Sequence, residues 1–287
     1  MRFIVHTSRS EAVCTASGGK MISYVHNEIP YLYSGDGTDR SEHLPVCFPA
    51  VPEEGDTSAH TEDFGSVSEN GLISDQSFQP ILLKPEKVSF SLENNAETKT
   101  QFPCRFRVNH TYTVNDNGFS AKFIVNNRDT KPMKYYLGTD PVFSLPLPEN
   151  ASASEYCLKI AAVDAKGETD SQLTERGKDV LCLDGTKDNI IRLADISAEF
   201  TTVAVGGPVE KQIRLFSEKT GHGIQIDPVG FRSLAVQLYK GESCICLKLF
   251  NYIPALSDEL TAEKQRNPEP TVPAGGEYTV GYVVTIL

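Results

Sequence analysis

Apolar and polar residues alternate along most of this chain with a period of two rather than 3.6. The alternation is strict over residues 87–93. Over residues 106–114 it places Phe106, Val108, His110, Tyr112 and Val114 on one side of an extended segment. Such alternation is typical of β-strands that bury one face. Further strands are predicted over residues 119–125, 156–163, 189–196, 199–205, 211–217, 231–239, 243–250 and 278–286.

Turn signals separate these segments, and helical patterns are few. Asn117-Gly118 lies between two strand segments, and because both residues tolerate positive φ it predicts a β-hairpin. Short helices are expected only over residues 169–180 and 257–266, and the polar stretches 52–77, 94–101, 164–179 and 257–276 are predicted to be loops. Strands joined by turns, without a βαβ rhythm, indicate stacked antiparallel sheets. Strand signals continue on both sides of every loop, so residues 1–287 are expected to form one domain.

Composition and charge narrow the range of partners. The chain has 27 Lys and Arg against 38 Asp and Glu, a net charge of −11, and no basic run, so neither nucleic acid nor a membrane surface is expected as a partner. No apolar window approaches the roughly 18 residues of a membrane-spanning helix, and the N-terminus does not resemble a signal peptide. The 7 scattered cysteines lack a Cys-x-x-Cys motif, which is typical of reduced thiols in the cytoplasm. Neither a metal nor a cofactor is expected.

Four separated parts of the chain, of which the first comprises two short segments, follow the motif order of one family. The chain opens with Ser17–Ser23 and Pro45–Pro49, continues with Asn126–Pro146, which contains Gly138-Thr-Asp-Pro-Val-Phe143, and ends with Gly230–Phe250 and Thr271–Tyr278. These segments resemble, in order, those of the aldose 1-epimerases, or galactose mutarotase-like proteins. The resemblance implies an all-β, galactose mutarotase-like β-supersandwich of stacked antiparallel sheets. It also implies a sugar cleft on an open sheet face and a small-molecule sugar, an aldose such as a hexose, as ligand. The sequence leaves the oligomeric state open.

Mutarotation requires a base to remove the anomeric hydroxyl proton while an acid protonates the ring oxygen. In the family a Glu is the base and a His in Gly-x-His-Pro is the acid. The matching catalytic positions hold Asp140 and Lys248, so both family residues are replaced. Asp is usually ionised near neutral pH, so Asp140 is a poor acid. Lys is usually protonated, so Lys248 is a poor base.

Three interpretations of this replacement remain open. Asp140 and Lys248 could meet as an ion pair in a non-catalytic site, or run the reaction with exchanged roles, Asp140 as base and Lys248 as acid. Alternatively, the site is misaligned and a carboxylate from Glu242, Asp258 or Glu259 is the base. The first interpretation predicts a carbohydrate-binding protein whose activity is reduced, altered or lost. The others predict an active aldose 1-epimerase, an isomerase. A structural or interaction protein on the same fold is a further alternative.

Four other residues are candidates for sugar binding by this resemblance. His60 stands in the segment that carries the family's binding His, unless Phe64 occupies that position, and Asp188 precedes a strand near the place of a sugar-binding Asp. Tyr136 and Phe143 could stack on the apolar face of a pyranose ring, although core packing explains such aromatic residues equally well. His110 is expected to be a packed, hydrogen-bonded side chain and His222 a turn residue.

Overall fold

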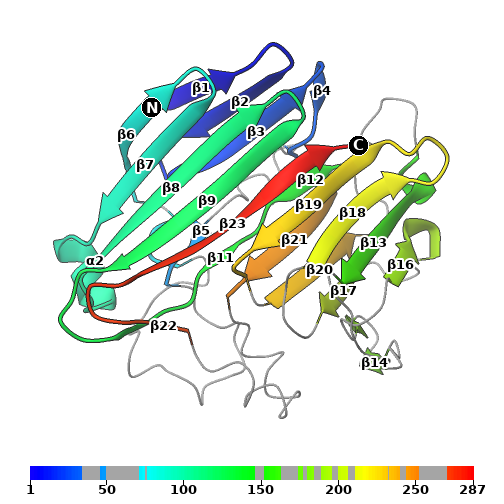
Figure 1. Cartoon of the computed structure of the whole chain (residues 1–287). Helices are drawn as coiled ribbons and strands as arrows, with labels where there is room; N and C mark the ends of the chain where they lie inside the picture. Colours follow the sequence, from blue (N-terminus) through cyan, green and yellow to red (C-terminus); the bar gives the residue numbers. More distant parts are fainter. Residues whose placement is uncertain are drawn as a thin grey trace.

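The computed structural model describes residues 1–33, 46–49, 71–74, 76–145, 152–162, 174–176, 180–183, 189–195, 200–205, 211–231, 233–239, 244–251 and 270–287. Nearly all regular structure in these ranges is β-strand, and the strands form layered sheets (Figure 1). The prediction of an all-β chain with stacked antiparallel sheets is therefore confirmed.

The largest sheet has nine antiparallel strands among the described residues. Across the sheet they are β16 (Asn189–Arg192), β13 (Tyr156–Ala162), β18 (Lys211–Ser217), β19 (Gly223–Val229), β23 (Glu277–Ile286), β9 (Gly118–Asn127), β8 (Phe106–Asn115), β7 (Lys87–Glu93) and β6 (Gln79–Lys84). The predicted hairpin joins β8 to β9. Gly118 has φ +152° there, and a Cβ on it would lie 1.9 Å from the carbonyl oxygen of Val284, so this position requires glycine.

A second sheet lies behind the first in Figure 1 and has eight strands in the described ranges. Its order is β14 (Thr174–Arg176), β15 (Val180–Leu183), β17 (Phe200–Val205), β20 (Ser233–Tyr239), β21 (Cys244–Phe250), β11 (Gly138–Thr139) and β5 (Val46–Cys47), with β12 (Val142–Ser144) also paired to β21. The pairing of β15 with β17 is parallel and the other pairings are antiparallel. This sheet carries Asp140 and Lys248.

The N-terminal segment forms a four-stranded sheet of β1 (Arg2–His6), β2 (Ser10–Thr15), β3 (Lys20–His26) and β4 (Ile29–Pro30). The short strands β10 (Met133–Lys134) and β22 (Thr271–Val272) pair with each other, and η2 (Ala153–Glu155) and η3 (Leu193–Asp195) are single 3₁₀ turns. One buried apolar cluster includes residues of all three large sheets, among them Val5, Phe90 and Ile245. The core therefore lies between the layers.

Four local predictions are wrong, and two of them are the predicted loops 164–179 and 257–276, which contain β14 and β22. Residues 94–101, predicted as a loop, contain helix α2 (Ala96–Gln101). Asn95 caps it by accepting from the Thr98 amide at 2.9 Å, while the Thr98 hydroxyl accepts from the Asn95 amide at 2.8 Å. Such a capping box starts a short helix without any apolar period. A helix over residues 169–180 is also wrong, because residues 174–176 form β14 and pair with β15. The helix predicted over residues 257–266 lies outside the described residues.

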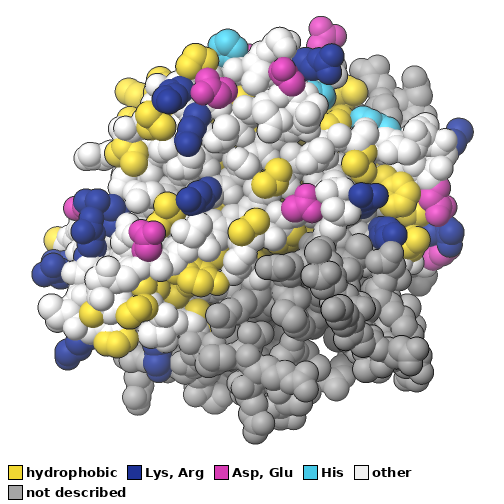
Figure 2. All heavy atoms as spheres, viewed as in Figure 1, with side chains coloured by type: hydrophobic (Ala, Val, Ile, Leu, Met, Phe, Trp, Pro, Cys, Tyr) yellow, Lys and Arg dark blue, Asp and Glu magenta, His cyan; other side chains and the backbone are white. Residues whose placement is uncertain are grey.

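The outer face of the nine-stranded sheet carries charged side chains of both signs, which are interspersed over its described part (Figure 2). Exposed large apolar side chains also occur in the described ranges, including Ile81 and Leu83 on the edge strand β6. Among the described residues, no helix is long and apolar enough to cross a membrane.

Candidate functional site

Strand pairing places Asp140 opposite Lys248. Thr139 on β11 pairs with Leu249 on β21, and Val142 on β12 pairs with Cys246. Between these pairs the Leu247 amide donates to the Pro141 carbonyl at 3.0 Å. Asp140 joins the two short strands, so it lies beside Lys248 on the neighbouring strand. Both side chains are half-buried.

Strand β21 divides its side chains between two environments. Ile245, Leu247 and Leu249 are at most 1% exposed and belong to the main core cluster. The alternate residues of a strand point to the opposite face, so Cys246, Lys248 and Phe250 share the other side. The Phe250 ring covers Gly138, because a Cβ on Gly138 would lie only 2.1 Å from the ring. Lys248 therefore lies on the side of β21 opposite to Leu247 and Leu249, and Phe250 on that same side still packs against the core cluster.

The charges of Asp140 and Lys248 affect the pKa values of two nearby thiols, Cys47 and Cys246. Burial raises the pKa of Cys47 well above its usual value; the negative charge of Asp140 raises it further and the positive charge of Lys248 lowers it. Burial also raises the pKa of Cys246, and the same two charges act on it in the same directions. Asp140 and Lys248 thus lie close to both thiols. The site brings a carboxylate and an ammonium group together beside two buried thiols.

This arrangement can hold and orient a polar ligand, and in principle it can transfer a proton. Adjacent opposite charges stabilise each other's ionised form. The pair therefore offers acceptor oxygens on one side and ammonium donors on the other, which is suited to a ligand with hydroxyl groups. Among the described residues, no three His, Cys, Asp or Glu side chains are grouped as a metal ion would require.

The predicted aromatic platform lies in the interior. Tyr136 is 3% exposed and Phe143 is 0% exposed, and both belong to the main core cluster. Phe143 pairs with Ile245 on the core side of β21. Of the two explanations weighed for these residues, burial favours core packing. His60, Asp188 and the alternative carboxylates Glu242, Asp258 and Glu259 lie outside the described residues.

The sequence analysis did not identify the thiol Cys47 as part of this site. It also did not identify a polar pocket that lies apart from the site and is lined by His26 and His222. Cys47 pairs with Gly138 through β5, a two-residue strand too short to give a periodic signal. The pocket contains His26, whose position two residues after the buried Tyr24 on β3 was an available signal for an inward-facing histidine. His222 was predicted as a turn residue; it follows Gly221 at φ +73° and also lines this pocket.

Comparison with known proteins agrees with this architecture. Among solved structures, the chain resembles a galactose mutarotase related enzyme from Lactobacillus acidophilus (TM-score 0.75, 15% identity, covering 100% of this chain and 97% of that one). It also resembles a galactose mutarotase-like protein from Lactobacillus casei (TM-score 0.73, 19% identity, covering 100% of both chains). At these identities the likeness shows the fold, which is the galactose mutarotase-like β-sandwich predicted from the motifs.

The sequence itself gives the family. A family profile described as aldose 1-epimerase matches residues 4–217, and the chain therefore belongs to the aldose 1-epimerase family. The chromosomal protein LacX of Lactococcus lactis subsp. lactis is 23% identical over 232 residues, which is 76% of each chain. The plasmid-encoded LacX is 23% identical over 229 residues, again 76% of each. Asp140 lies inside the matched range and Lys248 lies beyond it.

Proposed function

We propose that this chain is a carbohydrate-binding member of the aldose 1-epimerase family whose catalytic activity is reduced, altered or lost. The observation that carries the proposal is the juxtaposition of Asp140 and Lys248 on the side of β21 opposite to Leu247 and Leu249, next to Cys47 and Cys246. These two residues stand where the motifs of the family have its acid and its base. The ligand is a neutral aldose, such as a hexose.

Charge pairing is the reason for expecting weak catalysis. An ionised carboxylate has no proton to give to the ring oxygen, and a protonated amine has no lone pair with which to take the anomeric proton. Each charge stabilises the other, so the pair resists the changes that the family's reaction needs. The same groups remain good hydrogen-bond partners for sugar hydroxyls, because bonds to charged groups are the stronger ones.

Two measurements on the same protein test this proposal. Saturation-transfer NMR with D-glucose and D-galactose reports binding, and polarimetry of freshly dissolved α-anomers reports mutarotation. We expect saturation transfer to at least one sugar and a mutarotation rate close to that of buffer. Lys248→Met should weaken binding by roughly 10- to 150-fold, since it removes a charged donor worth roughly 1.5–3 kcal/mol.

Matched controls separate a site effect from a general one. Lys122→Met removes an exposed lysine from β9, and Asp195→Asn removes an exposed acid from η3; neither should change binding. Mutarotation far above the buffer rate that is abolished by Asp140→Asn would refute the non-catalytic proposal and favour the exchanged roles, with Asp140 as base. Absence of saturation transfer from every aldose tried would contradict sugar binding itself.

We further propose that residues 1–287 form one domain and that the protein works in the cytoplasm. The continuous buried cluster that includes all three large sheets supports the first proposal. The second is supported by the cysteines, since none of those described forms a disulfide bond.

A further inference from the structure

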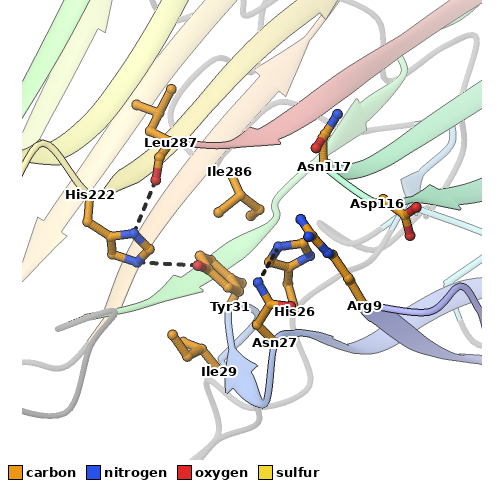
Figure 3. Close-up of a pocket in the computed structure, with 10 residues that line it drawn as sticks. All are labelled: Arg9, His26, Asn27, Ile29, Tyr31, Asp116, Asn117, His222, Ile286 and Leu287. Carbon is orange, nitrogen blue, oxygen red and sulfur yellow. Dashed lines mark hydrogen bonds between the residues drawn. The ribbon is translucent and has the colours of Figure 1, made fainter.

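A polar pocket of about 260 Å³ lies where the ends of several strands meet, and its lining includes no residue of β21. Figure 3 shows side chains from the turn after β3, the β8–β9 hairpin and the end of β23 converging on it. Tyr31, which is 1% exposed, lies between His26 and His222, with ring centroids 6.3 Å and 6.1 Å away. The pocket thus joins four parts of the chain that are far apart in sequence, since His222 comes from the turn between β18 and β19.

Hydrogen bonds fix the His26 ring as neutral. Asn27 Nδ2 can only donate, so at 3.1 Å from His26 Nε2 it identifies that nitrogen as the acceptor, and Nδ1 then donates to Ser10 Oγ at 2.9 Å. His222 Nδ1 donates to a main-chain oxygen of Leu287 at 3.1 Å, and its Nε2 lies 3.3 Å from the Tyr31 hydroxyl. Burial, followed by the charge of Arg9, lowers the pKa of His26, in agreement with a neutral ring.

The remaining side-chain charges in the lining balance. Arg9 and Asp116 are both exposed and carry opposite charges, which cancel each other, and the His26 ring is neutral. An anion would meet the Asp116 carboxylate and a cation would meet the Arg9 guanidinium. A neutral ligand with several hydroxyl groups can accept from Arg9 and donate to Asp116 together. The exposed side chain of Asn117 offers a further donor and acceptor at the rim.

The apolar part of the lining suits a small ring. Ile29 and Ile286 are half-buried and line the pocket beside Tyr31. Aliphatic and aromatic surfaces pack against C–H groups, while the few polar groups set orientation. Pockets for drug-sized ligands have volumes of about 300–1,000 Å³, so a pocket of 260 Å³ is suited to a smaller molecule with one ring.

We propose that this pocket is a second ligand site, which binds a small, neutral, polyhydroxylated molecule of monosaccharide size. It shares no lining residue with the Asp140–Lys248 site and goes beyond the function proposed above. One backbone contact connects the two: the Ser144 amide on β12 donates to the Tyr31 carbonyl at 2.9 Å. β12 in turn pairs with β21.

Methyl NMR tests each site independently. The δ1-methyl signals of Ile29 and Ile286 report on the pocket, and the methyl signals of Val142, which packs against Cys246, report on the other site. The full chain is titrated with D-glucose, D-galactose and inorganic phosphate. We expect at least one sugar to shift the two isoleucine signals in a saturable way, and phosphate to leave them unchanged. A shift of Val142 alone would leave the first function standing and overturn this proposal.

Paired variants test the residues. Arg9→Ala and Asp116→Ala should each weaken the isoleucine-detected affinity by about tenfold, which corresponds to the loss of one hydrogen bond to a charged group. The controls Arg128→Ala and Glu86→Ala remove exposed charges elsewhere and should leave it unchanged. Isoleucine signals that stay fixed with every sugar, that respond to phosphate instead, or that respond equally in Arg9→Ala and wild type would each overturn the proposal. Melting curves confirm that all variants fold.

Discussion

His110 on β8 is fully buried, and its replacement should change how stability depends on pH. Its ring lies between Phe78 and Phe123, with centroids 4.5 Å and 5.1 Å away. Nδ1 donates to the Gly19 carbonyl at 2.9 Å, so Nε2 carries the lone pair, and this buried atom has no hydrogen-bond partner among the described residues. Protonation would add a buried N–H without an acceptor. The informative variant is His110→Phe, which keeps an aromatic ring and removes the titrating group.

The size of the effect follows from the pKa. Burial lowers the pKa of His110 from 6.5 to about 4. Between pH 6.5 and about 4, His110 is protonated in the unfolded chain but neutral in the folded protein. Acid therefore favours unfolding. The wild type keeps its full stability above pH 6.5 and loses it progressively as pH falls towards 4. A shift of about 2.5 units at 1.36 kcal/mol each gives a loss of about 3 kcal/mol from this one residue.

Urea unfolding of both proteins at several pH values between 7 and 4 measures this loss. At pH 7, His110→Phe sets a baseline in which the Gly19 carbonyl keeps its bond from the Tyr112 hydroxyl at 3.1 Å. As pH falls, the difference in unfolding free energy should move by about 3 kcal/mol in favour of His110→Phe. His6→Phe, which removes an exposed histidine, is the matched control and should follow the wild type.

Parallel loss of stability in wild type and His110→Phe across this pH range would refute the reasoning. It would mean that His110 either titrates alike in both states or is protonated in the fold with a partner for Nε2.

Three further outcomes are expected. Asn127→Ala should lower the free energy of unfolding in urea by about 3 kcal/mol, because the buried side-chain amide donates to the carbonyls of residues 131, 272 and 273. The control Asn126→Ala loses one exposed hydrogen bond and should lower it far less. Gly138→Ala should lower the melting temperature through its clash with Phe250, and adding Phe250→Leu should recover part of the loss. Burial raises the pKa of Cys14 to about 12, so iodoacetamide at pH 8 should alkylate it only after unfolding, as mass spectrometry would detect.

The sheets were predictable from sequence because most strands bury a single face. Residues 211–217 form β18 as predicted, and the apolar residues of β8 that alternate from Phe106 to Val114 are all buried. Strand β6 was missed because Gln79-Pro-Ile-Leu-Leu-Lys84 lies on a sheet edge and does not alternate. The helix α2 was missed since its start depends on the side chains of Asn95 and Thr98.

The site was only partly predictable. Motif order pointed to Asp140 and Lys248 as residues of one site, although 108 positions separate them. Their juxtaposition depends on the two-residue strand β11 and the three-residue strand β12, which no periodic signal marks. The second pocket depends on turns and strand ends that meet only after the sheets assemble, so sequence alone indicated His222 as a turn residue and gave His26 no role.

The alternation along β21 has a consequence for how this protein can change over time. The odd-numbered residues from 245 to 249 belong to the main core, while Cys246 and Lys248 lie on the other side of the strand, Cys246 in a small separate apolar cluster. A substitution at position 248 changes the chemistry of this side of the strand and leaves the core cluster unchanged, because Lys248 is not part of it. Selection on folding and selection on chemistry therefore act on different residues of one strand. During evolution, position 248 can therefore be substituted, and the chemistry of this site changed, while the protein still folds.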